Sequence, residues 1–213
     1  MRFLLVFVLG LCGMMAEAGP WPRDKGAGFL SFSTEYDDED DAFYTALFGE
    51  YGVTPKLTAG VDLGFSDDTL YKAVGFARYP LVNQNADWRV AVELGAGVTD
   101  DEGVLRPGLH FGRGLNLGQK SGWFTIETFA YYQIEQDDVE VSTDITLGVN
   151  MTDRRKLILQ LQNGNQPMDP DYLNLTTSLV VEAKPGLHVE LGMKAGLQDE
   201  GKLAVKLGVW HSF

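Results

Sequence analysis

The chain has 213 residues, a formal net charge of −13, 45% hydrophobic residues and one cysteine, Cys12. The negative charge argues against a nucleic-acid partner, because phosphate backbones favour basic surfaces. The hydrophobic content and the small number of prolines, 8, are unlike those of a disordered chain. We therefore expect a folded protein that binds no nucleic acid.

The first eighteen residues have the pattern of an export signal. A basic start precedes an apolar run from Phe3 to Ala16, and residues 16–18 read A-E-A, a cleavage site of the A-x-A type. The run is too short to cross a membrane as a helix. The pattern predicts a signal peptide over 1–18 and an exported domain over 19–213, which has no cysteine and therefore no disulfide.

Beyond Phe29, apolar residues recur at every second position rather than at helical spacing. The segment from Trp88 to Val98 is the clearest, with apolar residues on one face and mostly charged or small residues on the other. Most such segments have ten to twelve residues, close to the length of a tilted strand that crosses a bilayer. Twelve segments have this character, at 27–36, 42–51, 57–66, 71–81, 88–98, 105–113, 122–132, 139–150, 156–163, 172–183, 187–197 and 202–213.

The connections between these segments form two alternating sets of opposite charge. One set has 17 carboxylates and no lysine or arginine; it comprises 37–41, 66–71, 99–104, 133–138, 163–171 and 198–201. The other set has five basic and two acidic residues; it comprises 52–56, 82–87, 114–121, 151–155 and 184–186. If the strands run up and down, one rim is acidic and the other basic. We predict an all-β fold, a closed antiparallel transmembrane barrel of about twelve strands, with ten to fourteen possible.

Aromatic residues also gather near the two ends of the strands. Two girdles of aromatic residues around an apolar band are typical of a membrane barrel. The acidic ends carry Tyr36, Phe43, Tyr44, Tyr71, Tyr132 and Tyr172, and the other ends carry Tyr51, Tyr79, Trp88, Trp123, Trp210 and Phe213. We expect these residues to form two such girdles.

The polar face of each segment is rich in glycine and in charges of both signs. Glycine suits a crowded concave interior, and charges are costly in lipid but can pair or hydrate in a lumen. We therefore expect the apolar face to contact lipid. The residues expected to line the lumen are Asp62, Arg78, Arg89, Glu93, Arg106, His110, Glu127, Asp144, Glu190 and Lys194.

The chain ends in an alternating strand, KLAVKLGVWHSF, whose last residue is Phe213. In this feature it resembles Gram-negative outer-membrane β-barrel proteins, whose final aromatic strand is the signal for the barrel-insertion machinery. The resemblance implies a location in the outer membrane, contact with lipid and lipopolysaccharide, and a role for Phe213 as the insertion signal. The hairpin EYGVTPKLTAGVDLGFSDD also resembles repeats in outer-membrane transporters associated with phenol-degradation operons.

Two kinds of chemistry receive little support from the residues. A lipid-modifying hydrolase needs a serine and a histidine close together near the lipid-exposed rim, whereas no H-x-S pair is present. The run DDEDD at 37–41 has hard oxygen ligands but lacks the spacing of a dedicated calcium loop. We expect no enzyme, no cofactor and no dedicated metal site.

The sequence leaves two functions open. Twelve strands fall between the eight that side chains fill and the sixteen of open porins. We favour a narrow passive pore or small-solute transporter with a charged lumen. The alternative is a non-conducting structural or interaction barrel, because long paired side chains can fill such an interior.

Overall fold

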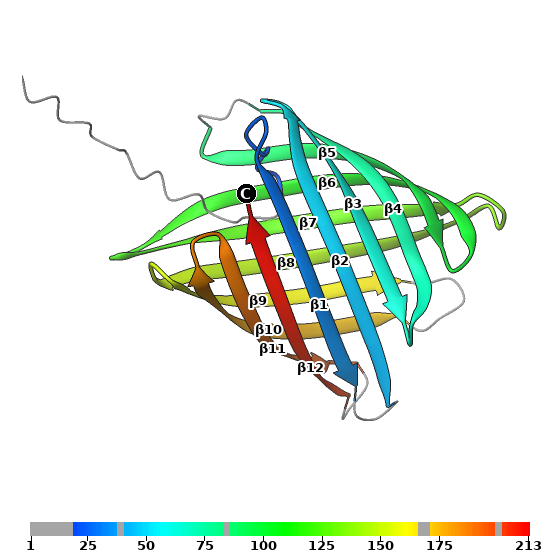
Figure 1. Cartoon of the computed structure of the whole chain (residues 1–213). Helices are drawn as coiled ribbons and strands as arrows, with labels where there is room; N and C mark the ends of the chain where they lie inside the picture. Colours follow the sequence, from blue (N-terminus) through cyan, green and yellow to red (C-terminus); the bar gives the residue numbers. More distant parts are fainter. Residues whose placement is uncertain (1–18, 38–40, 83–85, 166–170, 199–201) are drawn as a thin grey trace, which may run out of the picture.

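The computed structural model describes residues 19–37, 41–82, 86–165, 171–198 and 202–213, and within them twelve antiparallel strands form one closed barrel (Figure 1). The predicted signal peptide, 1–18, lies outside the described residues. The strands are β1 (Gly28–Asp37), β2 (Ala42–Thr54), β3 (Leu57–Ser66), β4 (Thr69–Pro80), β5 (Trp88–Thr99), β6 (Glu102–Leu117), β7 (Lys120–Gln133), β8 (Asp138–Thr152), β9 (Arg155–Asn165), β10 (Tyr172–Lys184), β11 (Leu187–Gly196) and β12 (Leu203–Ser212). The predicted fold class and strand number are confirmed.

The last strand closes the barrel against the first. The β1–β12 ladder runs from Phe29 opposite Ser212 to Asp37 opposite Ala204. Beyond the ladder, the Gly28 amide donates to the Phe213 carbonyl at 2.7 Å, and the Phe213 amide donates to the Gly28 carbonyl at 3.0 Å. Closure matters because an open strand edge would leave backbone groups without partners in hydrocarbon. The described residues contain no helix that is long and apolar enough to cross a membrane.

The apolar face of each strand points outward. On β12, Leu203, Val205, Leu207 and Val209 are 44–53% exposed, whereas Ala204 between them is 5% exposed. Large hydrophobic residues are exposed in the same way on all the other strands. Such a continuous apolar outer surface suits lipid rather than water. The predicted direction of the two faces is therefore confirmed.

Most of the strands from β2 to β10 are longer than the sequence pattern predicts, and several connections are shorter. Asp67, Asp68, Asp100 and Asp101 have φ between 45° and 64°, the left-handed conformation that two-residue hairpin turns need. Aspartate tolerates this conformation better than most residues. The predicted connection 99–104 is therefore wrong at its edges, since only two turn residues lie between β5 and β6.

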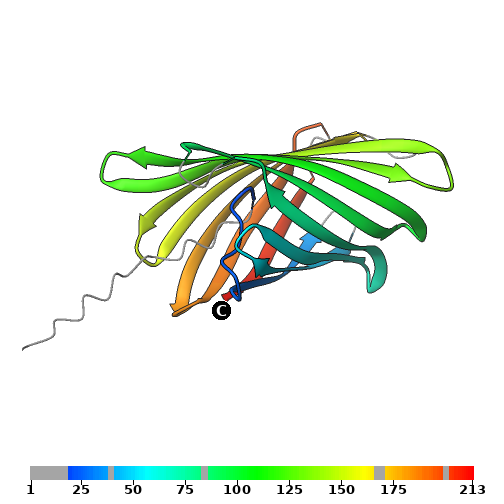
Figure 2. The ribbon, with the colours of Figure 1, turned by 90° about the horizontal axis from the view of Figure 1, so that it is seen from above.

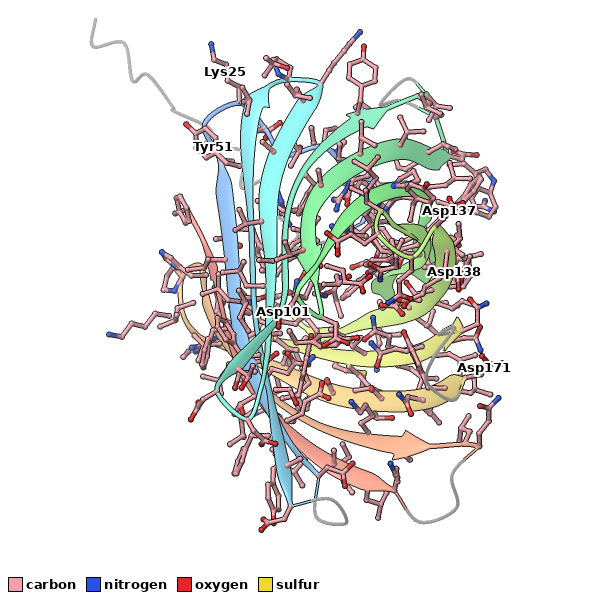
Figure 3. All side chains as sticks on the ribbon, turned by 90° about the vertical axis from the view of Figure 1, so that its right-hand side faces the viewer. Lys25, Tyr51, Asp101, Asp137, Asp138 and Asp171 are labelled. Atoms are coloured by element: carbon pink, nitrogen blue, oxygen red, sulfur yellow. The ribbon has the colours of Figure 1, made fainter. Side chains whose placement is uncertain are left out.

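Up-and-down topology sorts the charged connections to opposite ends of the barrel. We call the end with the β1–β2, β3–β4, β5–β6, β7–β8, β9–β10 and β11–β12 connections the acidic end, and the opposite end the basic end. Figure 3 shows Asp137, Asp138 and Asp171 far from Lys25 and Tyr51. The first described residues and the C-terminus lie together at the basic end (Figure 1). The β6–β7 and β7–β8 hairpins project beyond their neighbours (Figure 2).

The predicted aromatic girdles are only partly correct. Phe43, Tyr51, Tyr79, Trp88 and Phe213 are 45–61% exposed and point outward. Five other members line cavities inside the barrel, namely Tyr44, Tyr71, Tyr172, Trp123 and Trp210. Alternation explains the error: position along a strand sets the height of a side chain, but its parity decides whether it faces lipid or lumen.

Candidate functional site: the charged lumen

Arg78 on β4 is the centre of an ion-pair network inside the barrel. Its guanidinium donates to Glu50 on β2 at 2.5 Å and to Glu93 on β5 at 2.9 and 3.1 Å. Arg78 is 3% exposed, and the side chains of both glutamates are fully buried. Burial removes these charges from water, so the pairs must replace the lost hydration.

Arg106 on β6 extends this network toward the acidic end. It donates to Glu93 at 2.8 Å and to Asp62 on β3 at 2.6 Å, and Asp62 also pairs with Lys72 on β4 at 3.0 Å. The guanidinium lies 4.8 Å from the ring centre of Phe129 on β7. The network thus spans β2 to β6 and is packed on aromatic rings, which favour arginine over lysine at such sites.

His110 on β6 is completely buried beside the network. Its Nδ1 lies 2.9 Å from Glu127 on β7, and its Nε2 lies 3.5 Å from Glu93. The imidazole packs edge-on against Phe129 at 5.2 Å between ring centres. The structure therefore places His110 among lumen carboxylates, as the sequence predicts.

The far wall of the lumen carries separate charged pairs. Lys206 on β12 pairs with Glu190 on β11 at 3.3 Å, and Trp210 donates its Nε1–H to the same glutamate at 3.0 Å. Lys194 on β11 pairs with Glu35 on β1. Asp144 on β8 differs from these residues, because it faces Glu127 across the strand pair and accepts a long 3.4 Å hydrogen bond from Gln160.

Residues 19–27 enter the barrel from the basic end. The Gly19 carbonyl accepts a 2.7 Å hydrogen bond from Arg78. Arg23 pairs with Glu50 at 2.7 Å, and its amide donates to Thr58 at 3.0 Å. Trp21 packs against the buried cluster of Trp123, Ile158 and Val180. We call residues 19–27 the entry segment; it joins both the polar network and the apolar wall.

The described residues line two cavities inside the lumen, and these two share no lining residue. The inner cavity has a volume of about 300 Å³, and its wall includes Phe29, Trp123, Glu190 and Trp210. The outer cavity has a volume of about 440 Å³ and lies nearer the acidic end, where Tyr44 and Tyr172 line it. The side chains therefore do not fill the lumen completely.

The structure gathers most of the predicted lumen residues. Asp62, Arg78, Glu93, Arg106, Glu127, Asp144 and Glu190 line the inner cavity, and Lys194 lines the outer one. Arg89 takes a different place: it lies at the start of β5, and its guanidinium donates to the backbone carbonyl of Ala86. Phe213 lies outside the barrel wall at the basic end, 61% exposed and stacked on His211 at 5.5 Å.

Sequence reasoning did not select several residues of the site. Glu50 and Lys72 lie on strands whose two faces are both partly apolar, so the pattern does not indicate whether their side chains face the lumen or the lipid. Arg23 precedes the first strand, where alternation carries no information. The banding of aromatic residues predicts a girdle position for Tyr44, Tyr71 and Tyr172, which the structure places in the lumen. For the strand residues, the usable signal was parity relative to Asp62 and Glu93, because opposite residues in a ladder share a face.

No protein-family model and no curated protein sequence matches this chain. Solved structures do match it. The KdgM porin has a TM-score of 0.66 and 9% identity, over 87% of this chain and 99% of KdgM. The NanC porin has a TM-score of 0.66 and 10% identity, over 85% of this chain and 98% of NanC. An outer membrane channel from Pseudomonas putida F1 has a TM-score of 0.58 and 12% identity, over 92% of this chain and 99% of the channel.

These likenesses agree with the outward apolar surface and the charged lumen described above. The chain is an outer-membrane-type β-barrel with the twelve-stranded architecture of small porins. At identities of 9–12%, the comparisons establish the fold alone.

Proposed function

We propose that the chain is a narrow passive pore of a Gram-negative outer membrane that admits small solutes. The observation that carries this proposal is the pair of cavities stacked along the lumen, about 300 and 440 Å³ in volume. A barrel whose only role is mechanical would gain stability by filling such spaces with side chains. The porin fold supports the same function by analogy.

The charge pattern of the proposed pore favours cations over anions. At the acidic end, the β3–β4 and β5–β6 turns already expose four carboxylates, those of Asp67, Asp68, Asp100 and Asp101. The lumen charges, in contrast, are largely paired with one another. A ring of carboxylates at a mouth raises the local concentration of cations and repels anions. Inside, paired side chains act as a wall rather than as a row of free charges.

The test is single-channel recording with refolded protein in planar bilayers. We expect small, steady conductance events and a reversal potential that indicates cation preference under a potassium chloride gradient. The Glu93→Gln and Arg106→Gln variants check whether a closed network hides a pore, because both residues belong to the network. Absence of current in the wild type and in both variants would contradict the proposal.

The alternative function is a non-conducting structural or interaction barrel. The entry segment favours this alternative, because Trp21 and Arg23 occupy the basic end of the lumen. The two functions differ in one measurable respect: the structural barrel passes no current even when the entry segment is weakened.

We also propose the partners that the sequence suggests. The acidic end would meet lipopolysaccharide through shared divalent ions, and Phe213 would serve as the signal for the insertion machinery. The exposed position of Phe213 at the end of β12 leaves its ring accessible. Membrane fractionation of cells that express the wild type or Phe213→Ala tests both location and signal: we expect the wild type in the outer membrane and the variant depleted there.

A further inference from the structure

The outer cavity has a wall of tyrosines and neutral hydrogen-bonding groups. Its tyrosines are Tyr44 on β2, Tyr71 on β4, Tyr131 on β7 and Tyr172 on β10, so they come from strands around the barrel. Between them lie Thr99, Ser142, Gln162, Asn165 and Asn174. Ligand sites of proteins typically have cavities of about 300–1,000 Å³ with aromatic walls and a few polar groups, and this cavity fits that description.

Two of the tyrosine rings lie on glycines of the neighbouring strand. A Cβ atom added to Gly164 would meet the Tyr172 ring at 2.5 Å, and one added to Gly64 would meet the ring and hydroxyl of Tyr44. Each ring therefore covers bare backbone with one face. Both residues also line the cavity, so their side chains are within reach of a solute there. Rings held in this way form rigid surfaces that lose little side-chain freedom on binding.

The two lysines of this wall are already paired with carboxylates. Lys72 pairs with Asp62 at 3.0 Å, and Lys194 pairs with Glu35. Glu140, the other acidic lining residue, accepts a 3.4 Å hydrogen bond from Gln133. Among the described lining residues, an anionic solute would find no unpaired cation, and it would first have to pass the acidic end.

We propose that the outer cavity binds a neutral polyhydroxylated solute of the size of a mono- or disaccharide. The apolar C–H face of a sugar ring would stack on Tyr44 or Tyr172, and its hydroxyls would exchange hydrogen bonds with Gln162, Asn174 and the tyrosine hydroxyls. The proposal deepens the pore function and rests on it, because it names the solute class that would pass. A porin of the same fold, KdgM, was solved in complex with oligogalacturonate, an acidic sugar; neutralised lysines and an acidic end favour a neutral one here.

The test is direct binding to refolded full-length protein in detergent micelles, by saturation-transfer NMR and titration calorimetry. The probes are maltose, galacturonate and choline, which are neutral, anionic and cationic. We expect the wild type to bind maltose. We expect Tyr172→Ala to bind maltose about tenfold more weakly, which is the change expected from the loss of one stacking contact. Gln162→Leu should weaken maltose binding without disturbing the ring that covers Gly164.

Tyr79→Ala is the matched control, because Tyr79 is 45% exposed on the outer surface near the basic end of β4. It should bind maltose as the wild type does. Resistance to unfolding on unheated gels shows which variants keep the barrel. Preferred binding of galacturonate or choline, absence of maltose binding, or equal losses in Tyr79→Ala and Tyr172→Ala would overturn the proposal.

Binding in micelles needs no ion conduction, so the two proposals fail separately. Maltose binding together with absence of current would refute the pore and leave the site standing. Current without maltose binding would refute the site and leave the pore standing.

Discussion

Arg78 shows how single residues hold this lumen together. Its guanidinium contacts Glu50, Glu93 and the Gly19 carbonyl, and so joins two neighbouring parts of the wall to the entry segment. Removal of this cation takes one cationic partner from each buried glutamate and leaves Glu50 with Arg23 and Glu93 with Arg106. The cost of that state, rather than the attraction within the intact pairs, is what a mutation would measure.

We expect Arg78→Gln to lower the free energy of unfolding by about 3–5 kcal/mol, as for other broken buried ion pairs. Urea unfolding in lipid vesicles, followed by tryptophan fluorescence, measures this change. Arg154→Gln is the control, since Arg154 is 64% exposed and lies 3.9 Å from Glu182, so solvent screens that pair. Similar losses in the two variants would show that the buried network contributes little.

Glycine has two different roles at neighbouring positions of the sheet. A Cβ atom at Gly97, on the lumen face of β5, would clash with the backbone of Ala73 and Val74. A Cβ atom at Gly75, on the outer face of β4, would meet nothing within 4 Å. We expect Gly97→Ala to destabilise the barrel by about 1–3 kcal/mol, the range for overpacking.

Gly75→Ala should leave stability unchanged or raise it by about 0.4–1 kcal/mol, because alanine reduces the freedom of the unfolded chain. The same urea titration measures both variants. If Gly75→Ala is the more damaging of the two, the assignment of lumen and lipid faces on β4 and β5 is incorrect.

At the scale of strands and turns, clarity of the sequence pattern depends on what fills the lumen. The fourth and seventh predicted segments, 71–81 and 122–132, have less decisive faces than the others. In the structure, β4 points Val74 and Phe76 inward, and β7 points Trp123 and Phe129 inward. Both faces of these strands are therefore partly apolar: one contacts lipid and the other fills the interior. The alternation of apolar and polar residues is therefore weaker on strands whose lumen face also carries apolar side chains.

The aspartates in the turns of the acidic end have two roles: they adopt the backbone conformation of the turn, and they carry a negative charge. Asp67-Asp68 and Asp100-Asp101 adopt positive φ angles, which Asn-Gly also adopts readily. We expect replacement of both pairs by Asn-Gly to change stability by less than about 0.5 kcal/mol. The Asn-Gly variant should have a weaker cation preference than the wild-type pore. The difference should be largest at low salt, because salt screens charges and the screening length is already about 10 Å at 0.1 M.

Reversal potentials in potassium chloride gradients measure this preference. Asp153→Asn, in the β8–β9 turn at the opposite end, is the control and should have a smaller effect. An unchanged reversal potential in the Asn-Gly variant would mean that the acidic end does not select ions.

At the scale of the whole molecule, the entry segment decides how far the lumen is open. Trp21 and Arg23 connect it to the apolar cluster and to Glu50, whereas Lys25 is exposed. We expect Trp21→Ala/Arg23→Ala to raise single-channel conductance, because the basic end of the lumen loses two large side chains. Lys25→Ala should conduct as the wild type does. Equal conductance in all three proteins would show that the entry segment does not limit the pore.

The sequence by itself determined the fold class, a strand number near twelve and the outward apolar face. It could do so because strand periodicity and charge sorting are local properties, repeated along the whole chain. Only the tertiary structure decided which carboxylate pairs with which cation, that Arg89 stays apart from the network, and that five of the predicted girdle aromatics face inward. It also placed Gly19, Trp21 and Arg23 of the entry segment against the inner wall of the barrel. These features depend on strand register and closure, which bring together residues as distant as Lys194 and Glu35, and no local pattern encodes such distances.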